Sequence, residues 1–432
     1  MPEKYYEKSL RLRTLAVLLF SLLVTAASIF AYKSHMTLLL EEALLDYLQR
    51  RAPQNYPTES PIVLVSIEDL SFQKWPWPKL DFALILQALR SVYPQVVAFD
   101  VPFQRLDAYN PDFDKMFIKS LQRMRSVILP ATALTERGLD QELTNLITIP
   151  YRGTIDSIDT YHSALWPHEK FADHVSVGFS NTSPSFNNTI RRLPLIFRWK
   201  HKIAPSWALL AYAEYLNADL FKSEVIPGKA IILRNDKREF IEEIPIDPQG
   251  HLILRYYPLE AHIKKHEFND IILASESPNP EEIAGVDFPK LRKKLLVIAR
   301  MTPSIYEPID TPYQNNAAPV LPHLMGLHNL FHKSYIKSPS LTVLSVILFL
   351  LSFVSIALPF TFGNFRGGLY FIPLLVTEVA TSILIFNLAN IWLPTILIMT
   401  TMILSWLGGS ILNFTFAKRK LSNQLDLFEA NA

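Results

Sequence analysis

The sequence predicts an α/β protein, with a mixed or mostly parallel sheet flanked by helices, carried on four transmembrane α-helices. Two runs rich in Val and Ile, residues 62–67 and 95–99, predict buried strands. Apolar residues at helical spacing over 81–92 predict a crossover helix between them. A β-α-β unit of this kind belongs to a sheet that is buried on both faces. Four long apolar runs elsewhere in the chain predict the membrane part.

Composition excludes several classes of protein. The 432 residues carry 42 basic and 40 acidic side chains, so the chain lacks the basic excess typical of nucleic-acid binding. There is no cysteine, which excludes disulfides, thiolate metal sites and cysteine nucleophiles. Glycine-rich phosphate loops are absent from the sequence, so nucleotide hydrolysis has no visible machinery. We expect no cofactor and no nucleic-acid partner.

The membrane part is predicted from length, hydropathy and flanking charge. The first apolar run follows a basic segment and matches an uncleaved anchor better than a signal peptide, whose apolar core is shorter. Arg366 and the closing triplet Lys418–Lys420 lie beside the later runs, so the positive-inside rule places both termini in the cytoplasm. The predicted segments are a cytoplasmic N-terminus (1–13), four spans (14–32, 341–361, 369–389, 391–414), an extracytoplasmic domain (33–338) and a short tail (415–432).

These segments predict a multi-pass protein of the bacterial inner membrane, with the lipid bilayer as one partner. Residues 34–51 continue as a helix out of the first span, which suits either a stalk with a homodimer contact or packing on the main domain. Glu378 lies near the middle of the third span, where a carboxylate is costly and faces the bundle interior. We expect it to bind Thr400, Thr401 or Ser405 on the next span, because no second ionisable residue continues an ion pathway.

Further elements of the soluble region follow from the same patterns. Residues 135–174 have weak periodicity and are predicted to be irregular, and a charged surface loop is predicted around His262 and His266. Arg191 and Arg192 are expected at a solvated strand edge. The other predicted elements are helices at 112–124, 205–217 and 323–332, and strands at 126–134, 175–180, 190–200, 230–234, 251–257 and 295–299.

Polar residues follow the predicted strands at their carboxyl ends, where open α/β sheets hold ligands. Glu68 and Asp69 follow the first strand, and Asp100 follows the second. Arg300 and Thr302 follow another predicted strand and can pair with Asp100 or Glu68, either as an internal salt bridge or as part of a ligand site. These residues are candidates for ligand binding.

Two tryptophans and two histidine pairs complete the candidates. Trp75 and Trp77 stand between prolines and form either an aromatic wall for a ligand or a rigid lid over the core. The pairs His262/His266 and His328/His332 have the i,i+4 spacing that can hold a metal on a helix, but the sequence offers no further ligand set beside them. We therefore expect no metal.

Several segments, in this order, carry a resemblance to a known family: IVLVSIED, WPWPK with its following helix, VVAFDVPF, LLVIARMTPSIYEPIDTP and HLMGLHNLF. Over about residues 36–338 the chain resembles the second CHASE-type family, the cyclase- and histidine-kinase-associated sensory extracellular domains. The three closing spans also resemble that family's usual arrangement. The chain departs from the family where Ser66 replaces an acidic residue, Ala299 replaces a glycine and Arg300 replaces a small residue. The segment AAPVLP also replaces a small-residue stretch before His323, so a reshaped pocket is implied.

The resemblance implies a sensor, and three hypotheses are open. In the first, the extracytoplasmic domain detects an unknown small-molecule or envelope ligand and relays through the membrane helices to a separate cytoplasmic signalling partner, because only KRKLSNQLDLFEANA follows the last span. In the second, the chain is a non-signalling envelope interaction or scaffold protein whose output module is lost. A third is a hydrolase using Asp69, Asp100 and His323, which has weaker support, and we do not expect an enzyme.

Overall fold

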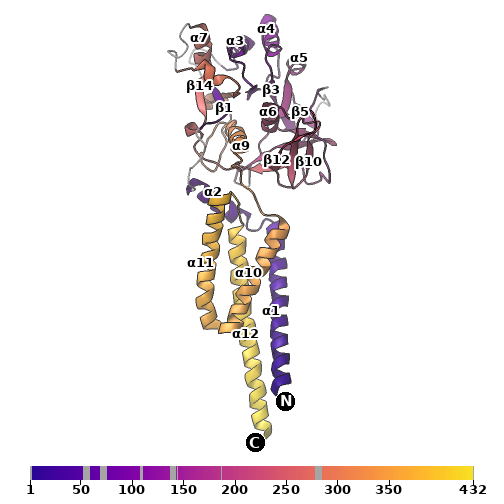
Figure 1. Ribbon diagram of the computed structural model, residues 1–432, viewed down its shortest axis with the longest axis vertical. Coiled ribbons are helices and arrows are strands. Elements are labelled where there is room, and N and C mark those ends of the chain that lie inside the picture. The colour runs from indigo at the N-terminus through magenta and orange to yellow at the C-terminus, as the bar shows by residue number, and fades with distance from the viewer. Residues whose placement is uncertain are drawn as a thin grey trace. The chain divides into compact units, whose positions relative to one another are not determined.

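The computed structural model describes residues 2–51, 59–68, 75–107, 110–136, 143, 145–185, 187–277 and 285–431, without the side chains of 2–10 and 419–431. The chain divides into two compact units (Figure 1). The membrane unit comprises Met1–Pro53 and Lys337–Ala432, and the soluble unit comprises Gln54–Ile336.

The membrane unit is entirely helical apart from its connections. Four of its helices contain a stretch long and apolar enough to cross a bilayer: Arg11–Lys33, Leu341–Phe362, Asn364–Ala389 and Thr395–Lys418. This agrees with the four membrane helices predicted from the sequence. The helices are α1 (Pro2–Lys33), α2 (Leu38–Arg51), α10 (Leu341–Phe362), α11 (Asn364–Ala389) and α12 (Thr395–Asn431).

Helix α12 packs against α1, α10 and α11. Hydroxyl pairs join it to two of them, Ser28 to Thr401 at 2.7 Å and Ser352 to Ser405 at 2.8 Å. Gly409 allows close packing as well, because a Cβ there would meet the backbone of Ile356 on α10 at 2.7 Å. Small residues and interhelical hydroxyl bonds are the usual means by which membrane helices associate.

The predicted partners of Glu378 are wrong. Its Oε1 accepts a hydrogen bond of 3.0 Å from Ser382, one turn along the same helix. The hydroxyls of Thr401 and Ser405 bind serines of α1 and α10 instead, because α12 packs closely against both of those helices.

The soluble unit is built on a seven-stranded sheet in which β14, β1, β15, β2 and β3 lie side by side in that order. These five strands are parallel, β6 continues the parallel sheet beside β3, and β5 pairs with β3 in the antiparallel sense. The β1–α3–β2 unit is present as predicted, and β15 lies between its two strands. The strand bounds are β1 (Ile62–Ile67), β2 (Val96–Phe99), β3 (Val127–Leu134), β5 (Ser163–Leu165), β6 (Ser176–Phe179), β14 (Lys264–Glu267) and β15 (Leu295–Arg300).

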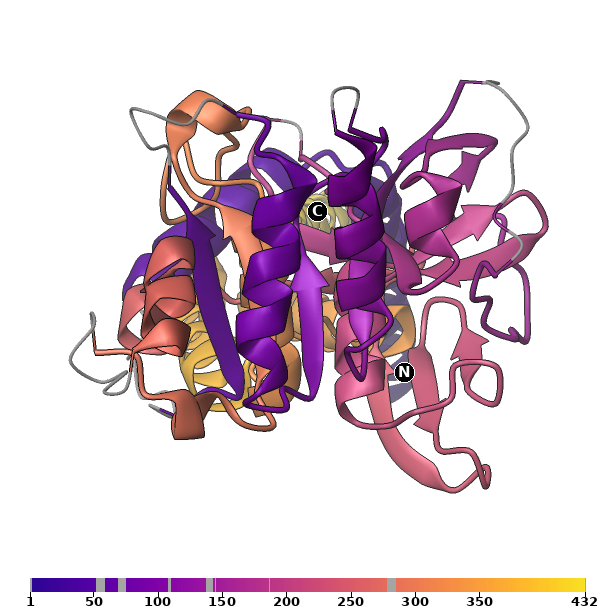
Figure 2. The same cartoon turned by 90° about the horizontal axis from the view of Figure 1, so that it is seen from above.

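Alternation along the strands divides the soluble core in two. In β15, Leu296 and Ile298 pack into one cluster with side chains of α3, α4 and α7, while Leu295 and Val297 pack into another with α6 and α9. The sheet is therefore covered on both faces, as its apolar strands predict. Figure 2 shows α3 and α4 side by side across the sheet. The helix bounds are α3 (Lys79–Arg90), α4 (Pro111–Leu121), α6 (Trp207–Tyr215), α7 (Phe268–Glu276) and α9 (Leu321–His332).

Smaller elements surround this core. A three-stranded antiparallel sheet consists of β10 (Glu224–Ile226), β11 (Ala230–Arg234) and β12 (Phe240–Pro245). Other short strands are β4 (Thr160–Tyr161), β7 (Arg192–Pro194), β8 (Ile196–Trp199), β9 (Lys202–Pro205) and β13 (His251–Ile253), and the short helices are α5 (Glu169–Ala172), α8 (Phe288–Leu291), and the 3-10 turns Leu259–Ala261 and Pro303–Ile305.

Three predictions for the soluble region are wrong. The stretch predicted as irregular contains β4, β5 and α5, because pairing with other strands fixes segments whose own periodicity is weak. His266 lies in the edge strand β14 rather than in a surface loop. Arg191 is 2% exposed, since its guanidinium turns inward and donates a hydrogen bond of 2.8 Å to Asn187.

Candidate functional site

Three neighbouring strands bring the predicted polar residues to one edge of the sheet. Ile67 of β1 pairs with Arg300 of β15. Phe99 of β2 pairs with Ile298, which lies two residues earlier in β15. The residues that follow these strands therefore meet at their carboxyl ends. We call this group the carboxyl edge, and it consists of Glu68, Trp75, Asp100, Arg300 and Thr302. Asp69 lies outside the described residues.

Glu68 is held by two partners, Thr302 just after β15 and Lys265 on β14. Thr302 donates a hydrogen bond of 3.0 Å to its Oε2, and the ammonium of Lys265 lies 2.8 Å from its Oε1. Burial alone would raise the pKa of Glu68, but the bonds from Lys265 and Thr302 outweigh burial and lower that pKa below its usual value. The predicted pairing of Thr302 with Glu68 is confirmed.

Asp100 and Arg300 lie close enough for the charge of Arg300 to act on the carboxyl group of Asp100, but the two side chains form no ion pair in the described part of the chain. The backbone N–H of Asp100 binds the carbonyl of Ile298 at 2.8 Å, which fixes the residue beside β15. Its carboxyl oxygen Oδ2 is buried and accepts no hydrogen bond. Burial raises the pKa of Asp100 to about 6, although the positive charge of Arg300 opposes this rise.

Arg300 is oriented by an aromatic ring and a carbonyl. Its guanidinium lies 5.7 Å from the centre of the Trp75 ring and donates a bond of 3.1 Å to the carbonyl of Ile305. Its Nε is buried and has no partner. The carboxyl edge thus contains an unused acceptor on Asp100 and an unused donor on Arg300, and buried polar atoms of this kind are costly unless something satisfies them.

The two tryptophans have different surroundings. Trp77 is 3% exposed and packs edge-on against Phe268 with ring centres 5.3 Å apart, so it belongs to the core. Trp75 is partly buried, lies 6.5 Å from the Trp77 ring and supports Arg300. The lid interpretation therefore fits Trp77, and the interpretation as an aromatic wall for a ligand stays a prediction for Trp75.

His323 has a different environment from the carboxyl edge. Its Nε2 lies 3.0 Å from the carbonyl oxygen of Ser180, and its ring packs edge-on against Trp207 at 5.4 Å. Burial lowers the pKa of His323 to about 4, so the imidazole is neutral at neutral pH. None of these contacts joins His323 to Asp100, so the geometry offers no support for a base–acid pair of the hydrolase hypothesis.

Two residues at the carboxyl edge were missed by the sequence reasoning. Lys265 lies on β14, which was predicted as loop, and its pairing with Glu68 depends on the register of β14 against β1. Tyr306 also feels the charge of Glu68: burial, followed by that charge, raises the pKa of Tyr306. The aromatic in the segment MTPSIYEP was the only sequence signal for the second residue.

A second cluster consists of three histidines. His328 and His332 lie on α9, and His262 lies in the turn before β14. His328 lies with its ring centre 4.3 Å from His332 and 5.7 Å from His262, and its Nδ1 binds the hydroxyl of Tyr257. Burial, followed by the neighbouring charges of His332 and His262, lowers the pKa of His328 to about 3. Across the described residues, no three His, Asp or Glu side chains are arranged to hold a metal ion.

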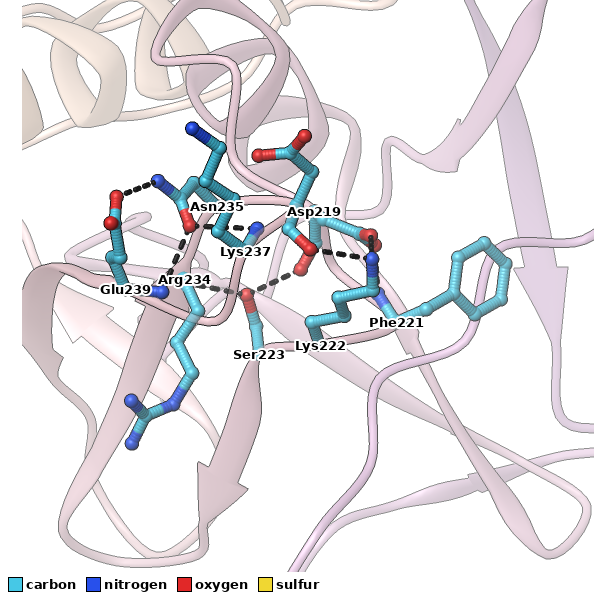
Figure 3. A network of polar contacts seen from close by, with 9 residues as sticks. Asp219, Phe221, Lys222, Ser223, Arg234, Asn235, Lys237 and Glu239 are labelled. Carbon is cyan, nitrogen blue, oxygen red and sulfur yellow. Dashed lines mark hydrogen bonds and ion pairs between the residues drawn. The ribbon is translucent and has the colours of Figure 1, made fainter.

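A hollow of about 300 Å³ lies beside α6 and is lined in part by Glu214, Asp219 and Phe221. Its acidic groups are already engaged. Asp219 accepts a bond of 2.9 Å from the backbone of Phe221 and pairs with Lys222 at 3.3 Å, and Glu214 accepts from Ser126. Figure 3 shows the polar network that continues from Asp219 into the β11–β12 turn. This hollow therefore has no unsatisfied acid to direct a ligand.

Inside the membrane unit, α2 is joined to the start of α12. The Oε1 of Glu41 accepts a hydrogen bond of 2.8 Å from the backbone N–H of Leu397, in the first turn of α12. Glu41 is 3% exposed, and burial raises its pKa to about 7 although the N–H groups of α12 oppose the rise. A carboxylate at this position satisfies free N–H groups and complements the positive end of the helix.

Comparisons with known proteins agree with this architecture. No curated protein and no solved structure gives a significant match. The CHASE2 domain family matches residues 16–359, which include most of the first membrane span, the whole soluble unit and most of α10. No catalytic domain is detected beside it. With most of its length covered by that match, the chain belongs to the CHASE2 domain family, as a membrane protein that joins this sensory domain to four candidate membrane helices.

Proposed function

We propose that this protein is a membrane-anchored sensor that binds a polar ligand at the carboxyl edge of its soluble unit. The soluble unit lies outside the cytoplasm, and the bound state is relayed through α2 and α12 to a separate cytoplasmic partner. The observation that carries the proposal is the pair of unused, buried polar atoms on Asp100 and Arg300.

The chemistry of these two atoms indicates the ligand. Oδ2 of Asp100 requires a hydrogen-bond donor, and Nε of Arg300 requires an acceptor. A hydroxyl group can serve both, and the exposed part of Trp75 offers an apolar face beside them. A neutral, hydroxyl-rich molecule such as a saccharide fragment of the cell envelope meets these requirements without adding an unpaired charge.

The relay is supported by the bond between Glu41 and α12. Helix α2 precedes the soluble unit in the chain, so a change in that unit acts on α2 through the backbone. Glu41 connects α2 to the first turn of α12. A ligand shifts such an arrangement only by binding one of two states more tightly, so its differential affinity sets the size of the signal.

The location of the soluble unit is testable because the chain has no native cysteine. Single cysteines introduced at Lys237 and at Arg366 can be labelled in intact cells with a membrane-impermeant maleimide. We expect Lys237→Cys to react and Arg366→Cys to react only after permeabilisation, as the positive-inside rule predicts. The reverse pattern would place the soluble unit in the cytoplasm and overturn the proposal.

Ligand binding is tested by a thermal-shift screen of the detergent-solubilised full chain against metabolites and cell-wall fragments. A true ligand raises the melting temperature of the wild type, and Arg300→Gln and Asp100→Asn reduce that rise. The control Lys237→Gln, on the exposed β11–β12 turn, leaves the rise unchanged. If every hit acts equally on the site variants and the control, the carboxyl edge is not the binding site.

The relay is tested by co-purification of proteins from membranes, with wild type, Glu41→Leu and a chain lacking residues 418–432. We expect a cytoplasmic partner to be retained by the wild type and lost with the deletion. Glu41→Leu should keep the partner bound but remove its response to ligand. If the tail is dispensable for every contact, the scaffold hypothesis becomes the better account.

A further inference from the structure

The opposite edge of the same sheet has a hollow of about 250 Å³. It lies where the chain enters three parallel strands, because its lining residues directly precede β2, β3 and β15 or end the helix before β2. We call this group the amino edge. Six of the lining side chains carry the argument, namely Arg90, Tyr93, Arg123, Arg125, Arg292 and Lys293.

The amino edge concentrates positive charge without compensation. Five of these six side chains are cations, whereas the whole chain is nearly balanced, and no lining residue is acidic. Arg125 donates a bond of 2.8 Å to the neutral side chain of Asn217. Within the described part of the chain, none of the five lies in an ion pair, although exposed lysines elsewhere, such as Lys115 with Asp112, do pair. Like charges brought together in this way repel one another unless an anion lies between them.

Helix dipoles account for only part of this cluster. Arg90 ends α3 and Arg123 follows α4, so each complements the negative end of its own helix. Arg292 and Lys293 follow α8, which has four residues and therefore little dipole to complement. A second feature is needed to explain why cations from three separate segments line one hollow.

The backbone around the hollow is fixed rather than loose. Tyr93 and Lys293 both adopt left-handed conformations, with φ of 50° and 57°, and the N–H of Lys293 binds the carbonyl of Tyr93 at 3.2 Å. This bond ties the turn before β2 to the turn before β15. Tyr93 is 73% exposed, so its ring is available to lie against a ligand at the mouth of the hollow.

We propose that the amino edge is a second binding site, for a small soluble anion that carries two or more phosphate or carboxylate groups. Guanidinium groups match such groups with two parallel N–H bonds, and four of the five cations are arginines. The volume suits a ligand smaller than most drug-sized molecules. The site is independent of the carboxyl edge and of the sensor proposal, because it stands on a different set of residues.

Inorganic pyrophosphate is the probe for this site. Calorimetric titration of the full chain in a non-ionic detergent at low salt should give saturable binding. The double variant Arg123→Gln/Arg292→Gln should weaken it at least about tenfold, since it removes two guanidinium groups. The matched variant Lys237→Gln/Arg238→Gln removes the same charge from the β11–β12 turn, where Figure 3 shows Lys237, and should change affinity less than about twofold.

Circular dichroism of both variants checks that they fold, which the exposure of all four altered side chains favours. Glycerol 3-phosphate, which stands for a lipid headgroup, is titrated in parallel. Weaker binding of glycerol 3-phosphate than of pyrophosphate supports a soluble polyanion, and tighter binding overturns that assignment. Absence of saturable pyrophosphate binding to the wild type, or equal loss in both double variants, would remove the site altogether.

Discussion

The two edges of one sheet differ in whether their charged groups are buried, paired or exposed. At the carboxyl edge, Asp100 and Arg300 have buried polar atoms without partners, and Glu68 is paired. At the amino edge, exposed cations gather with no acid among them. The first arrangement costs folding free energy through desolvation, and the second through repulsion that salt can screen.

This difference indicates the kind of ligand that each edge can bind. The carboxyl edge is half-buried and nearly neutral, so it gains most from a ligand that supplies hydrogen bonds to its buried polar atoms, because such bonds are strongest away from water. An exposed cationic edge gains most from charge, and its affinity must fall as salt rises. The following experiments test whether the edges differ as described, from the largest expected effect to the smallest.

Substitution of Trp77, the core tryptophan beneath the carboxyl edge, should differ most from substitution of Tyr93 at the amino edge. Trp77→Ala should lower the stability of the soluble unit by about 3–5 kcal/mol, because it opens a cavity beside Phe268. Tyr93→Ala should change stability by less than about 0.5 kcal/mol, since its side chain is mostly exposed. Thermal unfolding of both variants measures this. Similar losses in the two would mean that Trp77 does not anchor the carboxyl edge.

Asp100→Asn should stabilise the protein by about 1–3 kcal/mol at pH 7.5. The pKa of Asp100 is raised in the folded state to about 6, so folding at neutral pH has to bury an ionised carboxylate. The gain should shrink as pH falls below 6, because the folded wild type then takes up the proton. Melting temperatures at pH 7.5 and pH 5 check this, and a loss of stability at pH 7.5 would show that Asp100 has a structural partner.

The histidine cluster gives the folding stability a pH dependence of its own. That dependence has to be measured separately from the pH dependence of the two edges. The pKa of His328 is lowered from its ordinary value of 6.5 to about 3. Above pH 6.5 the imidazole is neutral in both the folded and the unfolded chain. Below pH 6.5 only the unfolded chain takes up the proton, so the folded state loses stability as pH falls. The wild type should lose about 1 kcal/mol per pH unit in this window, and His328→Gln should lose less. An unchanged slope in the melting temperature against pH would contradict this assignment.

Glu68→Gln should cost less than about 1 kcal/mol at pH 7.5, because Glu68 is partly exposed and solvent screens its pair with Lys265. The pKa of Glu68 is lowered, so its contribution is present above the ordinary value and is lost as pH falls below it. Its pH dependence is thus opposite in sign to that of Asp100. Measured relative to the wild type over pH 3–7.5, the melting temperatures of Glu68→Gln and Asp100→Asn should change in opposite directions as pH falls.

Salt should produce the smallest difference. Raising sodium chloride should stabilise the wild type slightly more than Arg123→Gln/Arg292→Gln, by under about 0.5 kcal/mol, because screening relieves the repulsion at the amino edge. Lys237→Gln/Arg238→Gln should respond as the wild type does. Equal responses in all three would mean that the cations do not repel one another measurably.

Local patterns were enough to predict the elements with a strong period. The β1–α3–β2 unit, β15 and α9 were each predicted within a few residues, because buried strands are continuous apolar runs and buried helices repeat at 3.6 residues. The edge strand β14 has the sequence KKHE and no such pattern. It is a strand only because β1 pairs with it, so Lys265 could not be assigned to the carboxyl edge from the sequence.

Pairing choices were also beyond the sequence. Thr302 was predicted to bind Glu68 or Asp100. Because β15 lies between β1 and β2, the strand order leaves both within reach, and the choice of Glu68 depends on the side-chain geometry of the folded protein. For Glu378 the polar residues of the next span were visible, but which helices would use them depended on how the bundle packs. The amino edge was missed because its cations are far apart in the sequence and form no local run.

Helix α12 continues for 37 residues, and at 1.5 Å per residue this is a rod of about 55 Å. The hydrocarbon core of a bilayer is about 30 Å thick. The candidate span ends at Lys418, so residues 419–431 extend the rod by about 20 Å beyond it. Because the first turn of α12, which Glu41 contacts, and residues 419–431 belong to one continuous helix, a displacement of that turn would also move the tail.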